Sequence, residues 1–163
     1  MATQVFVSPE KATQGASGYE PKRVNRWVVN FPSIFKIESW VVNSTQRPSI
    51  ILDGDTFKIN PINFVFLDPI GPSTAQRLMD IIRACPNNIE SLQKDSSSEL
   101  IEVLKNGFDY DLEMLDPTGV TVEKWTISNC EIISVDFSDL NYSESEPIKC
   151  KMIVQPKSFK LHF

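Results

Sequence analysis

The sequence of 163 residues is poor in the residue types that build catalytic and metal sites. Its one histidine, His162, stands next to the C-terminus, where a side chain is seldom held rigidly enough for a catalytic triad. The three cysteines, Cys85, Cys130 and Cys150, are widely spaced and form no C-x-x-C pair. They therefore indicate neither a zinc site nor a disulfide framework, and we expect buried, reduced thiols.

Other ligand-binding patterns are also missing. There is no G-x-x-x-x-G-K-[ST] and no G-x-G-x-x-G segment to hold phosphates. Asp53 and Asp55 begin like a calcium loop, but Phe57 and Ile59 stand where further ligands are needed. Acidic pairs on one strand could serve hydrolysis, yet the alternation in which they occur is typical of a solvated strand face. The sequence therefore predicts no cofactor, no metal and no enzymatic activity.

The charge balance and the lack of long apolar runs argue against a nucleic-acid-binding, membrane-spanning or secreted protein. Sixteen basic residues stand against 21 acidic ones, a net charge of −5, whereas proteins that grip phosphates carry an excess of Lys and Arg. An acidic surface suits a protein past which nucleic acid slides, or simply a soluble one. No run approaches the roughly 20 apolar residues of a membrane span, and residues 1–19 lack a signal peptide's apolar segment. We expect no membrane contact and a protein kept in a cytosol.

What the sequence does contain favours strands. Ten Phe, three Trp and three Tyr accompany many Val and Ile, and eleven Pro indicate enforced turns and strand edges. Residues 1–24 are polar and without periodicity, which predicts an N-terminal arm, either disordered or ordered against a neighbouring copy. Residues 25–163 are expected to form a single domain.

The clearest strand pattern lies between residues 108 and 154. Phe108, Tyr110, Leu112 and Met114 alternate with acids, and Asp116-Pro117-Thr118-Gly119 then predicts a turn. Further strands are predicted at 120–127, 130–137 and 148–154, which gives an antiparallel meander. Earlier strands are expected at 26–31 and 57–67, with 34–42 either a strand or an extended connection.

One helix is predicted with its boundaries. Ser73 and Gln76 form a capping box, apolar residues then recur at helical spacing, and Pro86 ends the pattern. This predicts a helix over 73–85, and a shorter one capped by Ser96 is expected to run to Lys105. The fold class is therefore mainly β (α+β): an antiparallel β-sandwich or barrel of about seven strands with one flanking helix and a long early loop.

Two features point to assembly. Ile50, Ile51 and Leu52 stand in a turn-rich segment, which indicates either an exposed hairpin with a partner surface or a short buried strand. The non-apolar side of the meander is expected to carry mostly acids, which would suit the inside of an aqueous tube closed edge to edge by identical sheets. These candidate lumen-facing residues are Asp109, Asp111, Glu113, Glu123 and Asp136.

The sequence resembles the tail tube proteins of contractile-tailed bacteriophages over about residues 25–163. The order and spacing of four segments carry the resemblance. They are Arg26-Trp27-Val28-Val29-Asn30-Phe31-Pro32, then Phe66-Leu67-Asp68-Pro69-Ile70-Gly71-Pro72-Ser73-Thr74, then Leu112-Glu113-Met114-Leu115-Asp116-Pro117-Thr118-Gly119 with Val122-Glu123-Lys124-Trp125, and Ile133-Ser134-Val135-Asp136-Phe137 with a closing strand.

The resemblance implies a subunit of hexameric rings that stack into a tube, located in the virion tail after assembly in the host cytoplasm. It implies as partners a tail sheath protein, a tape-measure protein, baseplate or neck initiator and terminator proteins, and DNA in transit. A long early loop reaches the adjacent ring in this family, and it maps onto roughly Asn43 to Phe57, with Arg47, Pro48, Ile50, Ile51 and Leu52 as the contact residues. Pro156 departs from the pattern because it interrupts the last strand.

Two alternatives stay open from the sequence. One is a tube initiator, baseplate or neck protein of the same fold, or the tube protein of a related injection system, and these differ in whether the rings stack indefinitely. The other is a monomeric β-sandwich module that binds sugar or peptide, which predicts a groove lined by exposed aromatic side chains.

Overall fold

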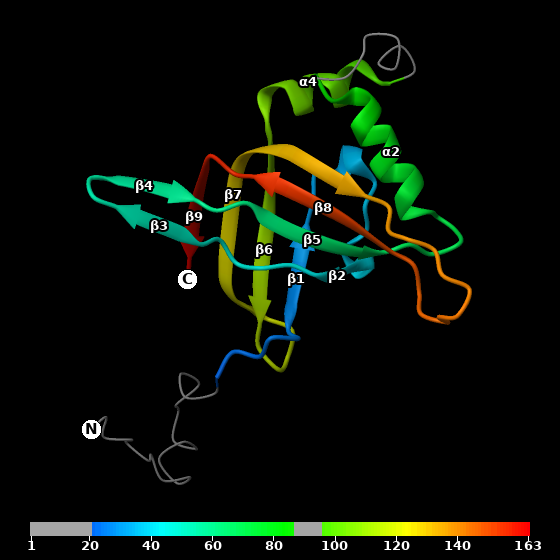
Figure 1. Cartoon of the computed structure of the whole chain (residues 1–163). Coiled ribbons are helices and arrows are strands. Elements are labelled where there is room, and N and C mark those ends of the chain that lie inside the picture. Colours follow the sequence, from blue (N-terminus) through cyan, green and yellow to red (C-terminus); the bar gives the residue numbers. More distant parts are fainter. Residues whose placement is uncertain (1–20, 87–95) are drawn as a thin grey trace, which may run out of the picture.

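The computed structural model describes residues 21–86 and 96–163 (Figure 1). Seven strands of this part form one antiparallel sheet, curled into a half-barrel, in the order β1-β6-β7-β8-β5-β2, with β9 also paired to β7. They are β1 (Trp27–Asn30), β2 (Val42–Ser44), β5 (Ile62–Leu67), β6 (Phe108–Leu115), β7 (Thr121–Asp136), β8 (Lys149–Gln155) and β9 (Ser158–His162). A separate hairpin pairs β3 (Ile50–Asp53) with β4 (Thr56–Ile59). The predicted fold class is confirmed, whereas residues 1–20 of the predicted arm lie outside the described residues.

The half-barrel is organised around β7, a single bent strand of 16 residues where two strands are predicted. Its first half pairs with β6 and β9, and its second half, from Glu131 to Asp136, pairs with β8. Asn129 has a φ of 54° at the bend, and the register shifts on both sides of it. We call β1, β6, the first half of β7 and β9 the front sheet, and the second half of β7 with β8, β5 and β2 the back sheet.

The core fills the space between the two sheets. Strand β6 contributes Phe108, Tyr110 and Leu112, which are buried as their alternation predicts. Strand β5 contributes Phe64, whose ring lies 5.2 Å from that of Tyr110 in an edge-to-face arrangement. Such aromatic contacts between strands of different sheets hold the sheets together and keep their inner faces dry.

Two helices lie together at one end of the half-barrel (Figure 1). Helix α2 (Thr74–Ala84) begins as predicted, because the Ser73 hydroxyl accepts a hydrogen bond from the Gln76 amide at 3.3 Å. Helix α4 (Ser98–Asn106) is capped by Ser97 rather than by Ser96. The structure therefore has a second flanking helix beside the one at 73–85.

The segment from 34 to 42 forms no strand before Val42, where β2 begins. It contains two short 3-10 helices, η1 (Ser33–Phe35) and η2 (Ser39–Val41), and Lys36 between them has a φ of 54°. Phe35 and Val41 are nevertheless buried, because each of the two 3-10 helices brings one side chain to the core. An apolar, β-branched run predicts burial, but tertiary packing decides the backbone conformation.

The last strand is interrupted at Pro156, as predicted. Strand β8 ends at Gln155 and β9 begins at Ser158, while the Lys157 amide donates to the Ser128 carbonyl at 3.3 Å. This break lies beside the bend of β7. The two neighbouring segments therefore turn together, and β9 joins the front sheet. Proline is tolerated here because the ladder is already interrupted.

Gly107 is predicted to be essential for the bend of β7. It has a φ of 84°, and a Cβ atom added there would lie 3.0 Å from the Asn129 Cα. We expect Gly107→Ala to lower the free energy of unfolding by about 3 kcal/mol, measured by urea denaturation. The control is Gly54→Ala in the hairpin turn, where φ is 59° but the space is open, so we expect about 1 kcal/mol. Equal effects would contradict the importance of the close approach to Asn129.

Candidate assembly surfaces

Both edges of the front sheet are open. Within residues 21–86 and 96–163, β1 pairs with β6 alone and β9 pairs with β7 alone. All pairs in this sheet are antiparallel, so the strand directions alternate across its four strands and β9 runs opposite to β1. The β9 edge of one copy can therefore continue as an antiparallel ladder on the β1 edge of another copy. Open edges with unpaired backbone groups are templates for such pairing.

The β3–β4 hairpin extends from the body beyond β9 (Figure 1). Of the two expectations for Ile50–Leu52, the exposed hairpin is confirmed and the buried strand is wrong. The register places Leu52 opposite Phe57, and they are 74% and 66% exposed. One face of the hairpin is apolar along its length: Ile50, Leu52, Phe57 and Ile59. Ile59 at the base is buried, but the other three are exposed, and an exposed apolar surface of this kind is typical of an interface.

The other predicted contact residues lie on the opposite face of the hairpin or precede the hairpin in the sequence. Ile51 is 53% exposed but points to the opposite face, where Lys58 is its partner. Arg47 and Pro48 precede the hairpin, and the base of the hairpin is held by the Gln155 side chain, whose Nε2 donates to the Ile59 carbonyl at 2.9 Å. The sequence analysis missed Phe57, because only the pairing with Leu52 reveals it. A contact of this segment with an adjacent ring stays a prediction.

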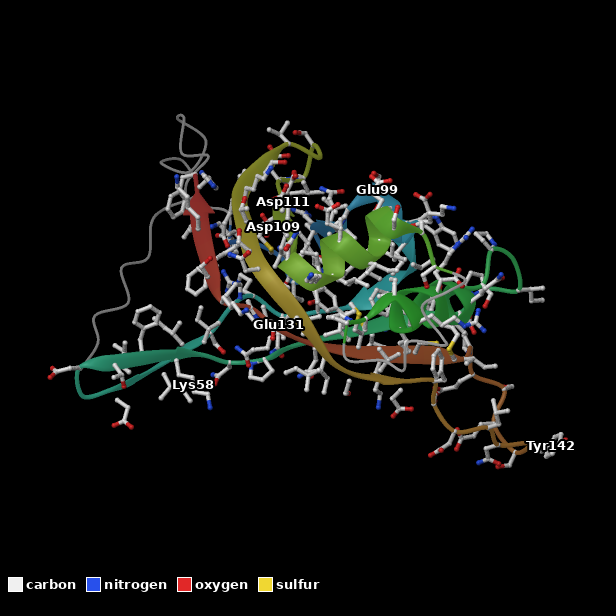
Figure 2. The ribbon with its side chains drawn as sticks, turned by 90° about the horizontal axis from the view of Figure 1, so that it is seen from above. Lys58, Glu99, Asp109, Asp111, Glu131 and Tyr142 are labelled. Atoms are coloured by element: carbon white, nitrogen blue, oxygen red, sulfur yellow. The ribbon has the colours of Figure 1, made fainter. Side chains whose placement is uncertain are left out.

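Three of the five predicted lumen residues share the open face of the front sheet. Asp109, Asp111 and Glu113 alternate along β6 with buried residues and therefore lie on its outer face; Figure 2 labels the first two. Basic residues of β7 and β9 lie on the same face. Lys124 Nζ is 3.0 Å from an Asp111 carboxylate oxygen, and the hydrogen bond and the charge of Asp111 raise the pKa of Lys124. The face is therefore polar with both signs of charge.

The remaining two residues lie elsewhere. Asp136 belongs to the second half of β7 and stands opposite Lys151 of the back sheet. Glu123 is opposite Met114, on the inward side, with only 3% of its side chain exposed. The prediction that Glu123 shares a face with the other acids is therefore wrong, because its place in the register puts it on the core side.

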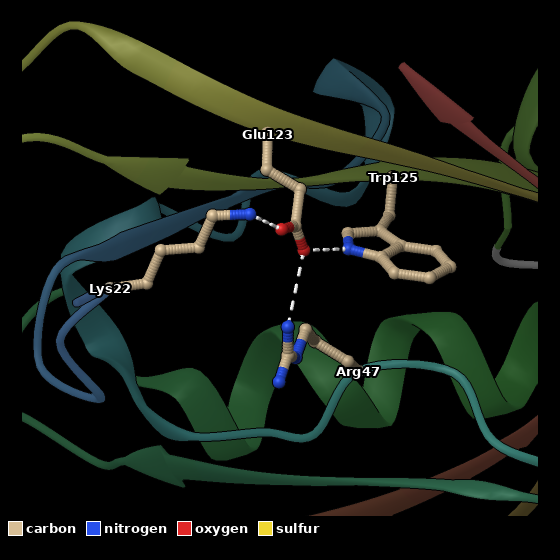
Figure 3. Close-up of polar contacts among 4 residues, drawn as sticks. All are labelled: Lys22, Arg47, Glu123 and Trp125. Atoms are coloured by element: carbon tan, nitrogen blue, oxygen red, sulfur yellow. Dashed lines mark hydrogen bonds and ion pairs between the residues drawn. The ribbon is translucent and has the colours of Figure 1, made fainter. Parts of the chain in front are cut away.

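Glu123 is the buried centre of a polar cluster whose two cations are about half exposed (Figure 3). Its carboxylate accepts hydrogen bonds from Lys22 Nζ and from the Trp125 indole, and it lies 3.4 Å from Arg47 Nη1. Desolvation raises the pKa of Glu123, but the Lys22 and Trp125 hydrogen bonds, the Lys22 charge and Arg47 together outweigh it, so the pKa is lowered. The charged carboxylate thus ties the segment before β1 and the segment before the hairpin to β7.

The cysteines behave as predicted where they are buried. Desolvation raises the pKa of Cys130 to about 12 and that of Cys150 to about 11, so both are unreactive thiols. Cys85 is half-buried. In the described part of the chain, no group of three His, Cys, Asp or Glu side chains is placed to hold a metal ion. None of the described helices is both long and apolar enough to span a membrane.

Comparison with solved structures gives matches over nearly the whole of both chains. A chain of the sheath–tube complex of an extracellular contractile injection system, PVC, in the extended state is 13% identical, with 96% of this chain and 99% of that one covered and a TM-score of 0.59. A chain of the tube-terminating cap of the anti-feeding prophage is 13% identical, with 99% of both covered and the same TM-score. A chain of the PVC sheath/tube terminator is 14% identical, with 88% and 98% covered and a TM-score of 0.57.

The chain has the fold of contractile injection system proteins. The resemblance predicted from the sequence is confirmed at this level. No family model and no curated protein matches the sequence itself.

We expect Glu123→Gln to weaken the attachment of residues 22–24 and 45–47. The buried carboxylate loses its charge while Lys22 and Arg47, each about half exposed, can return to water, so the loss is about 1 kcal/mol of unfolding free energy. Because folding lowers the pKa of Glu123, its contribution is complete above the ordinary glutamate pKa of about 4.3 and is lost as the pH falls through the folded value.

The measurement is urea denaturation of the wild type and Glu123→Gln from pH 7 down to pH 3. The two stabilities should converge at the acid end. Glu131→Gln is the control, since that carboxylate is exposed beside Lys157, and little change is expected. A constant difference between wild type and Glu123→Gln at every pH would rule out the charged state as the cause.

Proposed function

We propose that the chain is a structural subunit of the tube of a phage tail or a related contractile injection system. Copies join their front sheets edge to edge into hexameric rings, and the rings stack into a hollow tube. The observation that carries this proposal is a front sheet of four alternating antiparallel strands with both edges open. Closure of identical sheets into a barrel satisfies every open edge with one repeated contact.

In this arrangement the open face of the front sheet lines the lumen. Asp109, Asp111 and Glu113 then face the bore, whereas Glu123 is buried within the subunit and Asp136 belongs to the back sheet. A polar face on which Lys124 is paired with a carboxylate offers less grip on phosphates. DNA and a tape-measure protein could therefore pass or be held without tight binding.

The partners follow from the same proposal. The matching chains come from complexes described as sheath–tube, sheath/tube terminator, tube-terminating cap and, with a TM-score of 0.54, baseplate. We propose a tail sheath protein around the tube and initiator and terminator proteins at its ends. The protein then belongs to the virion tail, after assembly in the host cytoplasm, and acts without enzymatic chemistry.

A terminator or initiator role is the second candidate. The cap and terminator chains match with TM-scores of 0.59 and 0.57, as well as the chain of the sheath–tube complex. A terminator forms rings but does not continue to stack. The monomeric binding module is less favoured, because each of the three principal hollows formed by described residues is lined by only one aromatic side chain.

Electron microscopy of the purified protein, at increasing concentration, tests the proposal directly. Long hollow tubes are expected for a tube subunit, and single rings indicate the terminator or initiator role. A protein that stays monomeric at every concentration contradicts both.

Hydrogen–deuterium exchange tests which edges join. In the monomer, we expect amides of β1 and β9 that point outward to exchange quickly, since within the described chain each strand has one neighbour. On assembly these amides should be protected at least tenfold, while those of β8, which has neighbours on both sides, change little. Protection that leaves β1 and β9 unchanged would refute the proposed sheet junction.

Phe57→Asp is expected to block assembly without unfolding the subunit. Phe57 is 66% exposed, so its replacement should change the unfolding free energy by less than about 1 kcal/mol. A charge on the apolar face of the hairpin should nevertheless prevent its burial against another copy. Leu140→Asp adds the same charge at another exposed apolar side chain, on a loop away from the hairpin, and is the matched control. Assembly is measured by sedimentation velocity. If Phe57→Asp assembles as well as the control variant and the wild type, the apolar face of the hairpin is not part of the interface.

A further inference from the structure

A small hollow opens beside the β1 edge of the front sheet. Its volume is about 190 Å³. Trp27, Leu112 and Met114 contribute apolar surface, and Lys22, Arg23 and Arg47 contribute positive charge. We call this hollow the rim pocket. It combines an apolar lining with basic side chains at one site.

Within the described chain, positive charges at the rim pocket outnumber negative ones. Three cations face one carboxylate, that of Glu123, which already contacts Lys22 and Arg47. Thr45 also lines the pocket, and its hydroxyl oxygen is buried without a hydrogen-bond partner among the described residues. Buried polar atoms are nearly always hydrogen-bonded, so this hydroxyl indicates a missing partner. The pocket therefore suits an acidic group with apolar surface beside it.

The tip of the β3–β4 hairpin has this chemistry. Asp53 and Asp55 flank Gly54 at the turn, and both carboxylates lie on exposed residues. Leu52 and Phe57 stand directly behind them on the apolar face. The tip thus presents two negative charges and two large apolar side chains to solvent.

We propose that the hairpin tip of one copy docks in the rim pocket of a second copy. This inference rests on the proposed function, since it names the surface that receives the hairpin. The tip cannot enter its own pocket, because Arg47 lies at the base of the hairpin and a four-residue strand carries the tip roughly 13 Å away. Figures 1 and 2 show the hairpin pointing out from the body, at the end opposite to Tyr142.

The contact is heterologous, because a tip meets a different surface on its neighbour. Each copy then has one donor and one acceptor, so the contact repeats around a ring or along a stack. The buried cluster has a place in this scheme: Glu123 holds Lys22 and Arg47 at the pocket and is a positioning residue for the docking site.

Charge reversal tests the pairing. Asp55→Lys and Arg23→Glu each change one exposed side chain, at the tip and at the pocket. We expect each to raise the protein concentration needed for half-maximal assembly about tenfold or more, since like charges meet at the interface. The double variant should assemble at a concentration closer to that of the wild type. Asp139→Lys, an equally exposed acid in the loop that carries Tyr142, is the matched control and should have little effect.

Crosslinking tests the geometry independently. Asp55→Cys and Val24→Cys are made in separate proteins, mixed under assembly conditions and oxidised. A disulfide between the two proteins is expected, whereas Leu140→Cys with Val24→Cys is the control, since Leu140 is 80% exposed on a loop away from the hairpin. If the pocket is open in the monomer, Gln46→Cys should react rapidly with a thiol reagent. Slow labelling would show that the pocket is closed in the monomer and would overturn the proposal.

Failure of this inference is distinct from failure of the proposed function. If wild-type protein forms rings or tubes but the double reversal does not recover assembly, or the control pair crosslinks equally well, the hairpin docks elsewhere and the tube proposal stands. If wild-type protein does not assemble at all, the proposed function fails and the docking contact fails with it.

Discussion

The bend of β7 is the constraint on which the rest of the structure depends. A strand of 16 residues without a bend would hold all its neighbours in one layer, which leaves one face of every strand without a core. Asn129, with its positive φ, and Gly107, whose lack of a side chain lets the backbones approach, allow β7 to turn. The front and back sheets then face each other and bury the aromatic side chains of β5 and β6 between them.

The same bend produces the open edges. Strand β5 pairs with β8, but the Pro156 break carries β9 away with the first half of β7, so β9 keeps one side unpaired in the described chain. A β-sheet protein that acts as a monomer normally protects such an edge with charge, proline or a covering segment. Here the exposed apolar face of the hairpin lies beyond the same edge. The unpaired edge of β9 and the apolar face of the hairpin are both unfavourable in water. A neighbouring copy that covers this side of the molecule would explain both.

Local signals in the sequence predicted local structure. The Ser73 cap, the turn at Asp116 and the alternation from Phe108 to Met114 each depend on residues close in the chain, and each is found in the structure. Their energetics are set within a few residues, so the sequence pattern carries them.

The errors concern relations between distant segments. Glu123 was expected among the exposed acids, but its partners are Lys22 and Arg47, which are 101 and 76 positions away. Which face of β7 it occupies depends on the pairing with Met114 and not on its own charge. The continuity of β7 was missed for a related reason: Ser128 and Asn129 break the alternation locally, while β6, β8 and β9 hold the strand together across the break.

The charges on the front sheet suggest how a proposed conduit avoids holding nucleic acid. The net charge of −5 is not concentrated there, since Lys124 and Lys160 share the open face with Asp109, Asp111 and Glu113. A free lysine in the bore would be the group most able to bind phosphate. Asp111 removes that possibility at Lys124 by holding the ammonium group at 3.0 Å. If this face lines the bore as proposed, Asp111 limits retention of DNA by occupying Lys124, one of the two lysines on the face, rather than by a strong negative field.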